Sequence, residues 1–304
     1  MTLRQKIETI LSQIEELEAN PAPDKKLPQN TYYLNDREIV CYPRENGESR
    51  YPYDADGLVV WARSSGYIEA CESTFNIFQT IHFSEDPSVN FFAGIPMDSG
   101  DFYPLSLLGA GRQLFEPLVV KRYVVYAPRC AYYITDTEQV TFAVRLHTDK
   151  KKHIHFALTA INKTKETVPF YLASYHYAIL KFEETEAFWD RMNKFGFRLS
   201  ESSSLLRTGD NCLLINTCSD GGTVTDAYYT VAKSDFLGYK GRDMTNALSL
   251  RTGTFPRQAR AANTTEIPAA CDMIHMELAE GEMVRREYDL SYYHSIDEAK
   301  SHAK

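Results

Sequence analysis

The sequence predicts an all-β protein built as one large antiparallel β-sandwich with a short helix at each end. From about residue 31 onward, apolar and polar residues alternate with a period of two in one run after another. Short polar turns such as Glu45-Asn46-Gly47 separate these runs, and no run alternates with helical patterns. Aromatic residues, which favour pleated and half-buried surfaces, make up 12% of the chain. Together these features are typical of a sandwich or barrel and not of a parallel sheet.

The first segment, residues 1–27, is predicted to be an amphipathic helix followed by a linker. Apolar side chains recur at three- and four-residue spacing over residues 3–18: Leu3, Ile7, Ile10, Leu11, Ile14 and Leu17. The helix should end before Asn20-Pro21, which is a helix stop signal. Because one helix cannot bury its own apolar stripe, it must dock either on the main domain or on a partner subunit.

The sandwich itself is predicted to occupy residues 28–290, with about fifteen strands. The predicted strands are Thr31–Tyr42, Leu58–Arg63, Phe75–Phe83, Val89–Ile95, Leu118–Tyr126, Cys130–Thr135, Val140–His147, His153–Asn162, Thr167–Leu180, four shorter strands within 195–231, Ile267–Leu278 and Met283–Leu290. Residues 291–304 should then begin a second helix. Ser295 and Glu298 form a capping-box pattern at its start.

Composition excludes several classes of partner. The formal net charge of the 304 residues is −8, which disfavours nucleic acid as a ligand. No apolar run reaches the roughly 18–20 residues of a membrane span. The six cysteines match no standard zinc motif, and the first residues lack the apolar core of a secretion signal. We therefore expect a cytoplasmic protein with reduced cysteines that binds neither nucleic acid nor membrane.

Histidines and carboxylates offer two alternatives for chemistry. His153 and His155 should share one strand face, where a zinc ion could bind if His147 or His176 supplied a further ligand. No spacing requires this ion, so the sequence predicts no metal and no cofactor. A sugar mutarotase would need a histidine acid and a carboxylate base facing one pocket, for which His176 with Glu277 or Glu282 are the candidates. The sequence does not single these residues out, and no catalytic residue is assigned.

Two tryptophan–arginine pairs are candidate carbohydrate-binding residues. Trp61 and Arg63 should stand on one face of a strand, and Trp189 and Arg191 lie in the loop 181–193. An aromatic ring beside a guanidinium at the rim of a sheet can stack on a sugar ring and bind its hydroxyl groups. The alternative is that these side chains serve only in packing.

The segment 234–254, SDFLGYKGRDMTNALSLRTGT, interrupts the strand pattern with glycines at 238, 241 and 253. Its part Asp235–Arg242, followed by Asn246-Ala247-Leu248, resembles an insert in the N-terminal β-sandwich of glycoside hydrolase family 94. This family was formerly called glycosyltransferase family 36 and includes the cellobiose and oligoglucan phosphorylases. Tyr239 stands where the family usually has arginine, and Asn246 where it usually has proline. The strand at 268–278 and the turn at 278–282 also resemble family segments in the same order.

This resemblance, which spans roughly residues 55–302, implies a super-sandwich similar to the galactose mutarotase fold. It implies a non-catalytic part of a glycoside phosphorylase-like protein that acts on β-glucan-type oligosaccharides, in carbohydrate binding, scaffolding and dimerisation. The family's catalytic groups lie in a following (α/α)6 barrel, so none is carried onto this sequence. A free-standing carbohydrate-binding module and a mutarotase-like epimerase are the alternatives.

The same resemblance makes the insert a rim loop that contacts the barrel or a second subunit. The rim residues are Phe236, Leu237, Gly238, Tyr239 and Arg242. If the apolar rim and the stripe of helix 3–18 both face solvent, they should be covered by a second copy of the chain, because exposed apolar surface is costly. We therefore expect a homodimer with two-fold symmetry.

Overall fold

A computed structural model gives the structure of the protein. The structure describes residues 1–20, 26–27, 30–43, 49–73, 75–78, 87–109, 117–182, 193–238, 247–263 and 266–304. In this part of the chain no helix is long and apolar enough to cross a membrane.

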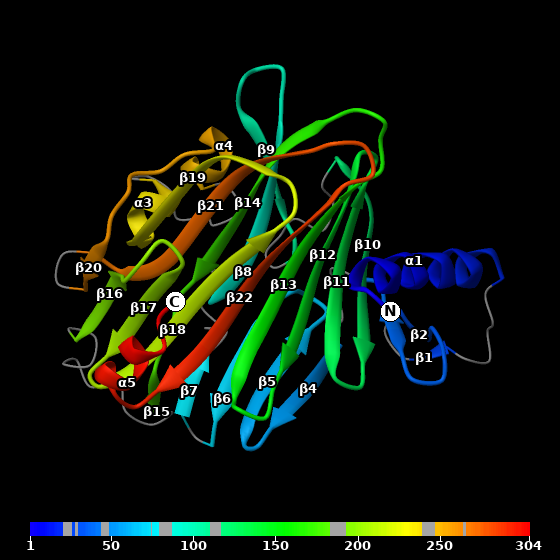
Figure 1. Ribbon diagram of the computed structural model, residues 1–304. Helices are drawn as coiled ribbons and strands as arrows, with labels where there is room; N and C mark the ends of the chain where they lie inside the picture. The colour runs from blue at the N-terminus through cyan, green and yellow to red at the C-terminus, as the bar shows by residue number, and fades with distance from the viewer. Residues whose placement is uncertain are drawn as a thin grey trace.

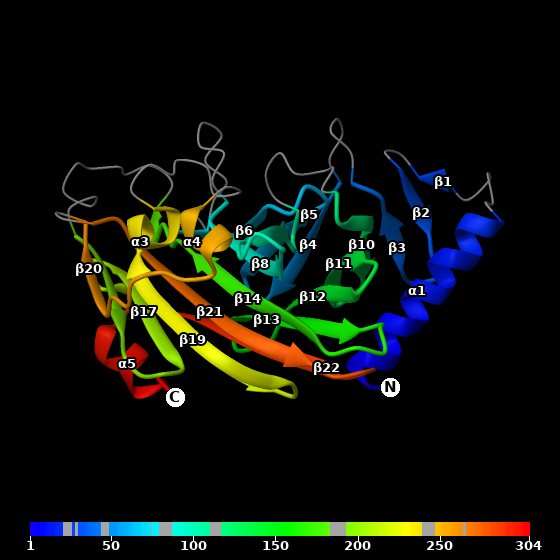
Figure 2. The ribbon, with the colours of Figure 1, turned by 90° about the horizontal axis from the view of Figure 1, so that it is seen from above.

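The architecture is a β-sandwich in which one twelve-stranded sheet faces two five-stranded sheets (Figures 1 and 2). Sheet A has the order β1 (Lys26–Leu27), β2 (Thr31–Tyr33), β3 (Ile39–Cys41), β10 (Val119–Ala127), β11 (Cys130–Thr137), β12 (Val140–Thr148), β13 (His153–Asn162), β22 (Met283–Tyr293), β18 (Asn211–Asp220), β17 (Ser203–Thr208), β16 (Lys194–Arg198) and β20 (Arg260–Ala262). Sheet B has the order β15 (Lys181–Phe182), β7 (Phe75–Phe78), β6 (Ile68–Glu72), β5 (Leu58–Arg63) and β4 (Arg50–Ala55). Sheet C has the order β19 (Thr223–Ala232), β21 (Pro268–Leu278), β14 (Val168–His176), β8 (Val89–Pro96) and β9 (Phe102–Ser106). Neighbouring strands in these sheets, such as β13 with β22 and β14 with β21, pair in antiparallel orientation. The predicted all-β sandwich is thus confirmed.

The core lies between sheet A and the two smaller sheets. Val140, Phe142, Val144 and Leu146 on β12 point into it, because side chains two residues apart in a strand share one face. Ala143, which lies between Phe142 and Val144 on the same strand, belongs to a separate cluster on the outer face of sheet A. This alternation is the pattern that made the strands recognisable in the sequence.

Helix α1 (Leu3–Ala19) covers one end of that outer face (Figure 1). Thr2 and Gln5 form a capping box at its start, and Asn20 follows its last turn. Ile7, Ile10 and Ile14 are at most 1% exposed because they pack on β10 and β11 of the same chain. The helix therefore docks on its own domain, and its stripe no longer argues for a second subunit. The homodimer itself stays a prediction.

Short helix α5 (Ile296–Ser301) confirms the second predicted helix. The hydroxyl of Ser295 accepts a hydrogen bond from the backbone N–H of Glu298. Ala299 is buried against Leu205 and Leu214 on the outer face of sheet A, at the opposite side of the molecule from α1 (Figure 2).

Five edge strands were missed by the sequence prediction: β1, β4, β9, β15 and β20. Strands β4 and β9 lie at the edges of sheets B and C and contain Pro52 and Pro104. Proline cannot donate a ladder hydrogen bond, so it weakens a strand pattern but is tolerated at an edge. Strand β6 was also missed. The predicted strand Thr31–Tyr42 is instead the hairpin β2–β3, whose turn is closed by the Leu34 N–H donating to the Glu38 carbonyl at 2.9 Å.

Phe236 and Leu237 were expected on an exposed apolar rim, but both are buried. Helices α3 (Lys233–Leu237) and α4 (Leu248–Thr252) pack on sheet C, and Phe236 and Leu237 are 0% and 6% exposed among Phe92, Tyr175 and Leu250. These rim residues are therefore buried within the chain, because the two helices fold onto the sheet surface. Tyr239 and Arg242 lie outside the described residues.

Replacing Gly238 with alanine should lower the free energy of unfolding by about 1–3 kcal/mol. Gly238 has φ +80° and ψ 160°, a region that essentially only glycine adopts, and an added Cβ would lie 2.6 Å from the Cβ of Leu248. The matched control is Gly281→Ala, where φ is also positive but nothing lies within 4 Å of the added Cβ. Chemical denaturation measures both. Equal losses in the two variants would show that the contact with Leu248 contributes nothing.

Candidate functional site

A polar cleft of about 670 Å³ opens between β18 and β22 of sheet A and β19 and β21 of sheet C. These are the yellow to red strands of Figure 1. The cleft is larger than the other described cavities and lies within the usual size range of small-molecule sites. It forms at the end of the sandwich where inward-facing positions carry polar instead of apolar side chains.

The floor of the cleft is a buried ion pair. Asp272 on β21 is 4% exposed and Arg286 on β22 is 8% exposed. Both side chains occupy inward positions, because Ile274 and Val284, two residues away on their strands, belong to the core. The Arg286 Nη2 donates to Asp272 Oδ2, and its Nη1 donates to the Ser219 hydroxyl at 2.7 Å. A charge this deeply buried is tolerated because it is paired and hydrogen-bonded.

Two hydroxyl groups complete this floor. The Ser174 and Tyr288 hydroxyls donate to Asp272 Oδ1 at 2.6 and 2.9 Å, and the Arg286 Nε donates to the Tyr288 oxygen at 2.9 Å. Burial alone would raise the pKa of the Asp272 carboxyl, but the Arg286 guanidinium and these hydrogen bonds outweigh it and hold the pKa below its usual range. Asp272 is therefore an ionised carboxylate whose acceptor sites are already engaged, which makes it a weak candidate for a general base.

Beneath the floor lies a second inward residue, His176 on β14. It is 1% exposed, and both ring nitrogens lack a hydrogen-bond partner among the described residues. Burial lowers the pKa of His176 to about 4, so its imidazole is neutral near pH 7. A cavity of about 10 Å³, close to the size of one water molecule, connects His176 with Ser174, Asp272 and Tyr288.

Tyrosine and arginine side chains form the walls and rim. Tyr229 on β19 pairs across the ladder with Asp272 and so faces the same side of sheet C. The Arg198 guanidinium lies 4.8 Å from the Tyr229 ring centre and donates to the Ser204 hydroxyl at 3.0 Å. Its Nε has no partner within the described chain. At the rim, Arg257 lies 5.4 Å over the Tyr228 ring.

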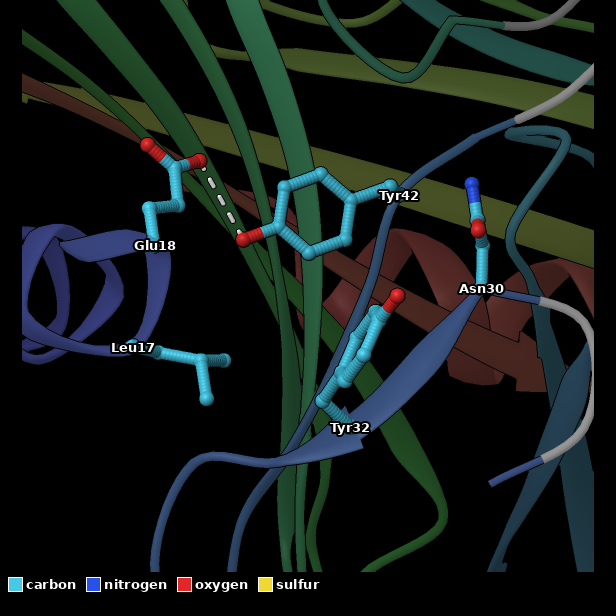
Figure 3. Close-up of a pocket in the computed structure, with 5 residues that line it drawn as sticks. All are labelled: Leu17, Glu18, Asn30, Tyr32 and Tyr42. Atoms are coloured by element: carbon cyan, nitrogen blue, oxygen red, sulfur yellow. Dashed lines mark hydrogen bonds between the residues drawn. The ribbon is translucent and has the colours of Figure 1, made fainter. Parts of the chain in front are cut away.

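A separate, smaller cavity of about 270 Å³ lies between α1 and the β2–β3 hairpin (Figure 3). Leu17 and Glu18 come from α1, and Tyr32 and Tyr42 present their rings toward the same space. The Tyr42 hydroxyl donates to Glu18 at 3.2 Å, and Glu18 also pairs with Lys121. The carboxylate of Glu18 is thus already neutralised by Lys121. We therefore regard the larger cleft as the better candidate site.

Trp61 and Arg63, one of the two pairs predicted to bind sugar, do not line the cleft. Trp61 and Arg63 project from the outward face of β5, where Arg50 lies 4.8 Å over the Trp61 ring and Arg63 pairs with Glu69 at 2.8 Å. These contacts fit the packing alternative. Trp189 and Arg191 lie outside the described residues.

The mutarotase pairing from the sequence is also not assembled. Glu277 is exposed and lies on the opposite face of β21 from Asp272, while Glu282 accepts a hydrogen bond from the Ala279 N–H in a turn. On the β14–β21 ladder, His176 pairs with Ala270 and Glu277 pairs with Pro169. The two residues are thus separated by about 23 Å along the strands.

Asp272 and Arg286, the charged floor of the cleft, were not identified from the sequence, although the strand pattern carries a signal for them. Asp272 falls in phase with Ile274 and Met276, and Arg286 falls in phase with Val284 and Leu290. Charged residues at positions that the period of two assigns to the core indicate a buried polar site.

Comparisons with known proteins give remote likenesses. No protein-family model and no curated protein matches the sequence. A galactose mutarotase related enzyme from Lactobacillus acidophilus is similar in structure with TM-score 0.47 and 9% identity, over 81% of this chain and 97% of that chain. An aldose epimerase homologue from C. elegans has TM-score 0.42 and 11% identity, over 82% of this chain and 100% of that chain. A putative kojibiose phosphorylase from human microbiome has TM-score 0.44 and 9% identity, over 91% of this chain but only 35% of that chain. At these values the likenesses carry no argument, and the fold rests on the ladders described above.

Proposed function

We propose that the protein binds a carbohydrate in the cleft between sheets A and C. The observation that carries this proposal is the buried Asp272–Arg286 pair lying next to the Tyr229 ring. A sugar presents apolar ring faces and many hydroxyl groups. An aromatic ring can stack on the former, while fixed guanidinium groups and hydroxyls can hydrogen-bond the latter.

Each cleft residue then has a role in binding. Tyr229 provides the stacking surface, and the guanidinium of Arg198, which lies against that ring and lines the cleft, is a donor for a sugar hydroxyl. The ion pair holds Arg286 and Tyr288 in fixed positions, so little side-chain entropy is lost when a ligand binds.

We further propose that this cleft belongs to the non-catalytic sandwich of a glycoside phosphorylase-like protein. The support is the resemblance of the segment around Phe236 and Gly238 to the family 94 insert, together with the engaged state of Asp272, which leaves it unsuited to proton transfer. On this proposal the substrate is a β-glucan-type oligosaccharide, and the partner is a helical (α/α)6 barrel or a second copy of the chain.

A mutarotase-like epimerase is the second candidate, and His176 is the observation that favours it. A neutral imidazole, the form that burial favours for His176, can take the proton from an anomeric hydroxyl while an acid protonates the ring oxygen, which opens the ring and allows closure on the other face. The candidate is second because His176 is 1% exposed and does not line the cleft, where a sugar would bind.

Calorimetry with β-glucan oligosaccharides tests the binding proposal. We expect saturable binding that weakens by about fivefold or more in Tyr229→Ala, since loss of a stacked ring removes about 1 kcal/mol or more. The matched control, Tyr32→Ala, removes a tyrosine from the cavity beside α1 and should leave affinity unchanged. Absence of binding, or equal affinity in Tyr229→Ala, would contradict the proposal. Polarimetry with fresh α-glucose separates the second candidate, which alone predicts faster mutarotation.

A further inference from the structure

The outer face of sheet A carries a histidine–aspartate cluster that the cleft does not use. His147 on β12, His155 on β13 and Asp289 on β22 are direct neighbours across the ladders. His153 lies two residues before His155 on the same face, and Asp149 lies in the turn that joins β12 to β13. Three strands and one tight turn therefore bring together residues that are up to 142 positions apart, from His147 to Asp289.

The two oxygens of Asp149 have different partners. Its Oδ1 accepts hydrogen bonds from the backbone N–H groups of Lys151 and His153 at 2.8 and 3.0 Å, which fixes the carboxylate in the turn. Its Oδ2 lies 3.2 Å from His155 Nε2 and 3.4 Å from His153 Nδ1. All three groups offer a ligand atom within 4.8 Å of the others.

The two separations from Asp149 Oδ2 suit a tetrahedral metal ion. Nitrogen and oxygen ligands bind Zn²⁺ at about 2.0–2.1 Å, so two ligands of one tetrahedral ion lie about 3.3 Å apart. An imidazole, imidazole and carboxylate set is typical of zinc and not of Mg²⁺ or Ca²⁺, which prefer oxygen ligands.

Asp289 provides the outer support that zinc-binding histidines usually have. Its Oδ1 lies 2.7 Å from His155 Nδ1, so that nitrogen carries the proton and Nε2 is left to face Asp149. Lys304 pairs with the other oxygen of Asp289 at 2.9 Å, and the His147 ring stacks on His155 with centres 4.6 Å apart. These contacts hold the His155 ring in one orientation.

We propose that Asp149 Oδ2, His153 Nδ1 and His155 Nε2 bind one Zn²⁺ ion, with water as the fourth ligand. The side chains of the three residues are 34%, 29% and 21% exposed, so the ion reaches the site directly from solvent. The site is on the opposite face of sheet A from the cleft, and it stands whether or not the cleft binds carbohydrate.

Metal titration of the chelator-treated, tag-free protein tests this site. The background should carry Cys218→Ser, because Cys218 is the one exposed cysteine and its thiol could also bind zinc. Competition against a chromophoric chelator should give one equivalent of Zn²⁺, and Co²⁺ should give the visible absorption of a tetrahedral complex. No uptake of either metal would overturn the proposal.

Three variants locate the ion. Asp289→Asn should weaken Zn²⁺ binding by about 10–100-fold, the usual effect of losing an outer-shell partner. His155→Ala and His153→Ala each remove a ligand and should cost more than that. The matched control is His294→Ala, which changes a histidine that contacts Tyr292 and Asn211 instead. Unchanged affinity in His153→Ala, whose partly exposed side chain can be lost without unfolding the sheet, would refute the assignment even if His155→Ala failed to fold.

Discussion

Replacing Arg286 with methionine is expected to lower the free energy of unfolding by about 3–5 kcal/mol. The substitution leaves Asp272 as a buried carboxylate without its counter-ion, held only by the Ser174 and Tyr288 hydroxyls. Methionine fills much of the space of the arginine side chain, so the loss reports mainly on the uncompensated charge and not on a cavity. Chemical denaturation near neutral pH measures it.

The neighbouring residue provides the matched control for this first prediction. Arg285 lies on the outward face of the same strand and pairs with Glu287 in solvent, with both side chains more than a third exposed. Its replacement by methionine should change stability by no more than about 1 kcal/mol. The double variant Arg286→Met with Asp272→Asn removes both charges and should recover part of the loss. If Arg286→Met costs no more than Arg285→Met, Asp272 is not a buried anion.

The second large effect is a dependence of stability on pH that comes from His176. Its pKa is lowered to about 4 by burial, whereas an unfolded histidine has a pKa of about 6.5. Between these values the unfolded chain binds one more proton than the folded chain, so stability rises with pH across this window. The full effect is about 3 kcal/mol, and it is lost progressively as pH falls from about 6.5 to about 4.

His176→Gln isolates this contribution because glutamine does not titrate. When the pH falls from about 7.5 to about 5, the free energy of unfolding of the native protein should fall by about 2 kcal/mol more than that of the variant. Each protein is compared with itself at the two pH values, so any packing cost of the substitution cancels. A nuclear magnetic resonance titration that places the His176 pKa near its unfolded value would contradict this prediction, as would parallel pH profiles for the two proteins.

Much of the fold could be predicted because the sandwich relies on local patterns. Strands β5 (Leu58–Arg63) and β13 (His153–Asn162) were predicted with their observed bounds, since a period of two is visible within one strand. The α1 stripe and the Ser295 cap are equally local. The strands that were missed are short or lie at edges, where proline and weak alternation obscure the pattern.

The candidate sites were harder to predict from the sequence, because their residues come together from strands that are far apart along the chain. The prediction placed His153 and His155 on one face, but it could not choose between His147 and His176 as their neighbour. The ladders settle this choice, because His147 lies beside His155 on sheet A while His176 points into the core from sheet C.

The order of the residues was enough to predict that the chain forms strands, which side chains share a face, and where the terminal helices begin. The three-dimensional arrangement was needed to show that β22 lies between β13 and β18, which places Arg286 opposite Asp272 and Asp289 beside His155. It also decided that α1 and Phe236 are covered by the chain's own sheets. The physical reason is that alternation specifies the face of a strand but not its neighbours. The neighbours depend on which distant strands together bury the most apolar surface while pairing their backbone groups and buried charges.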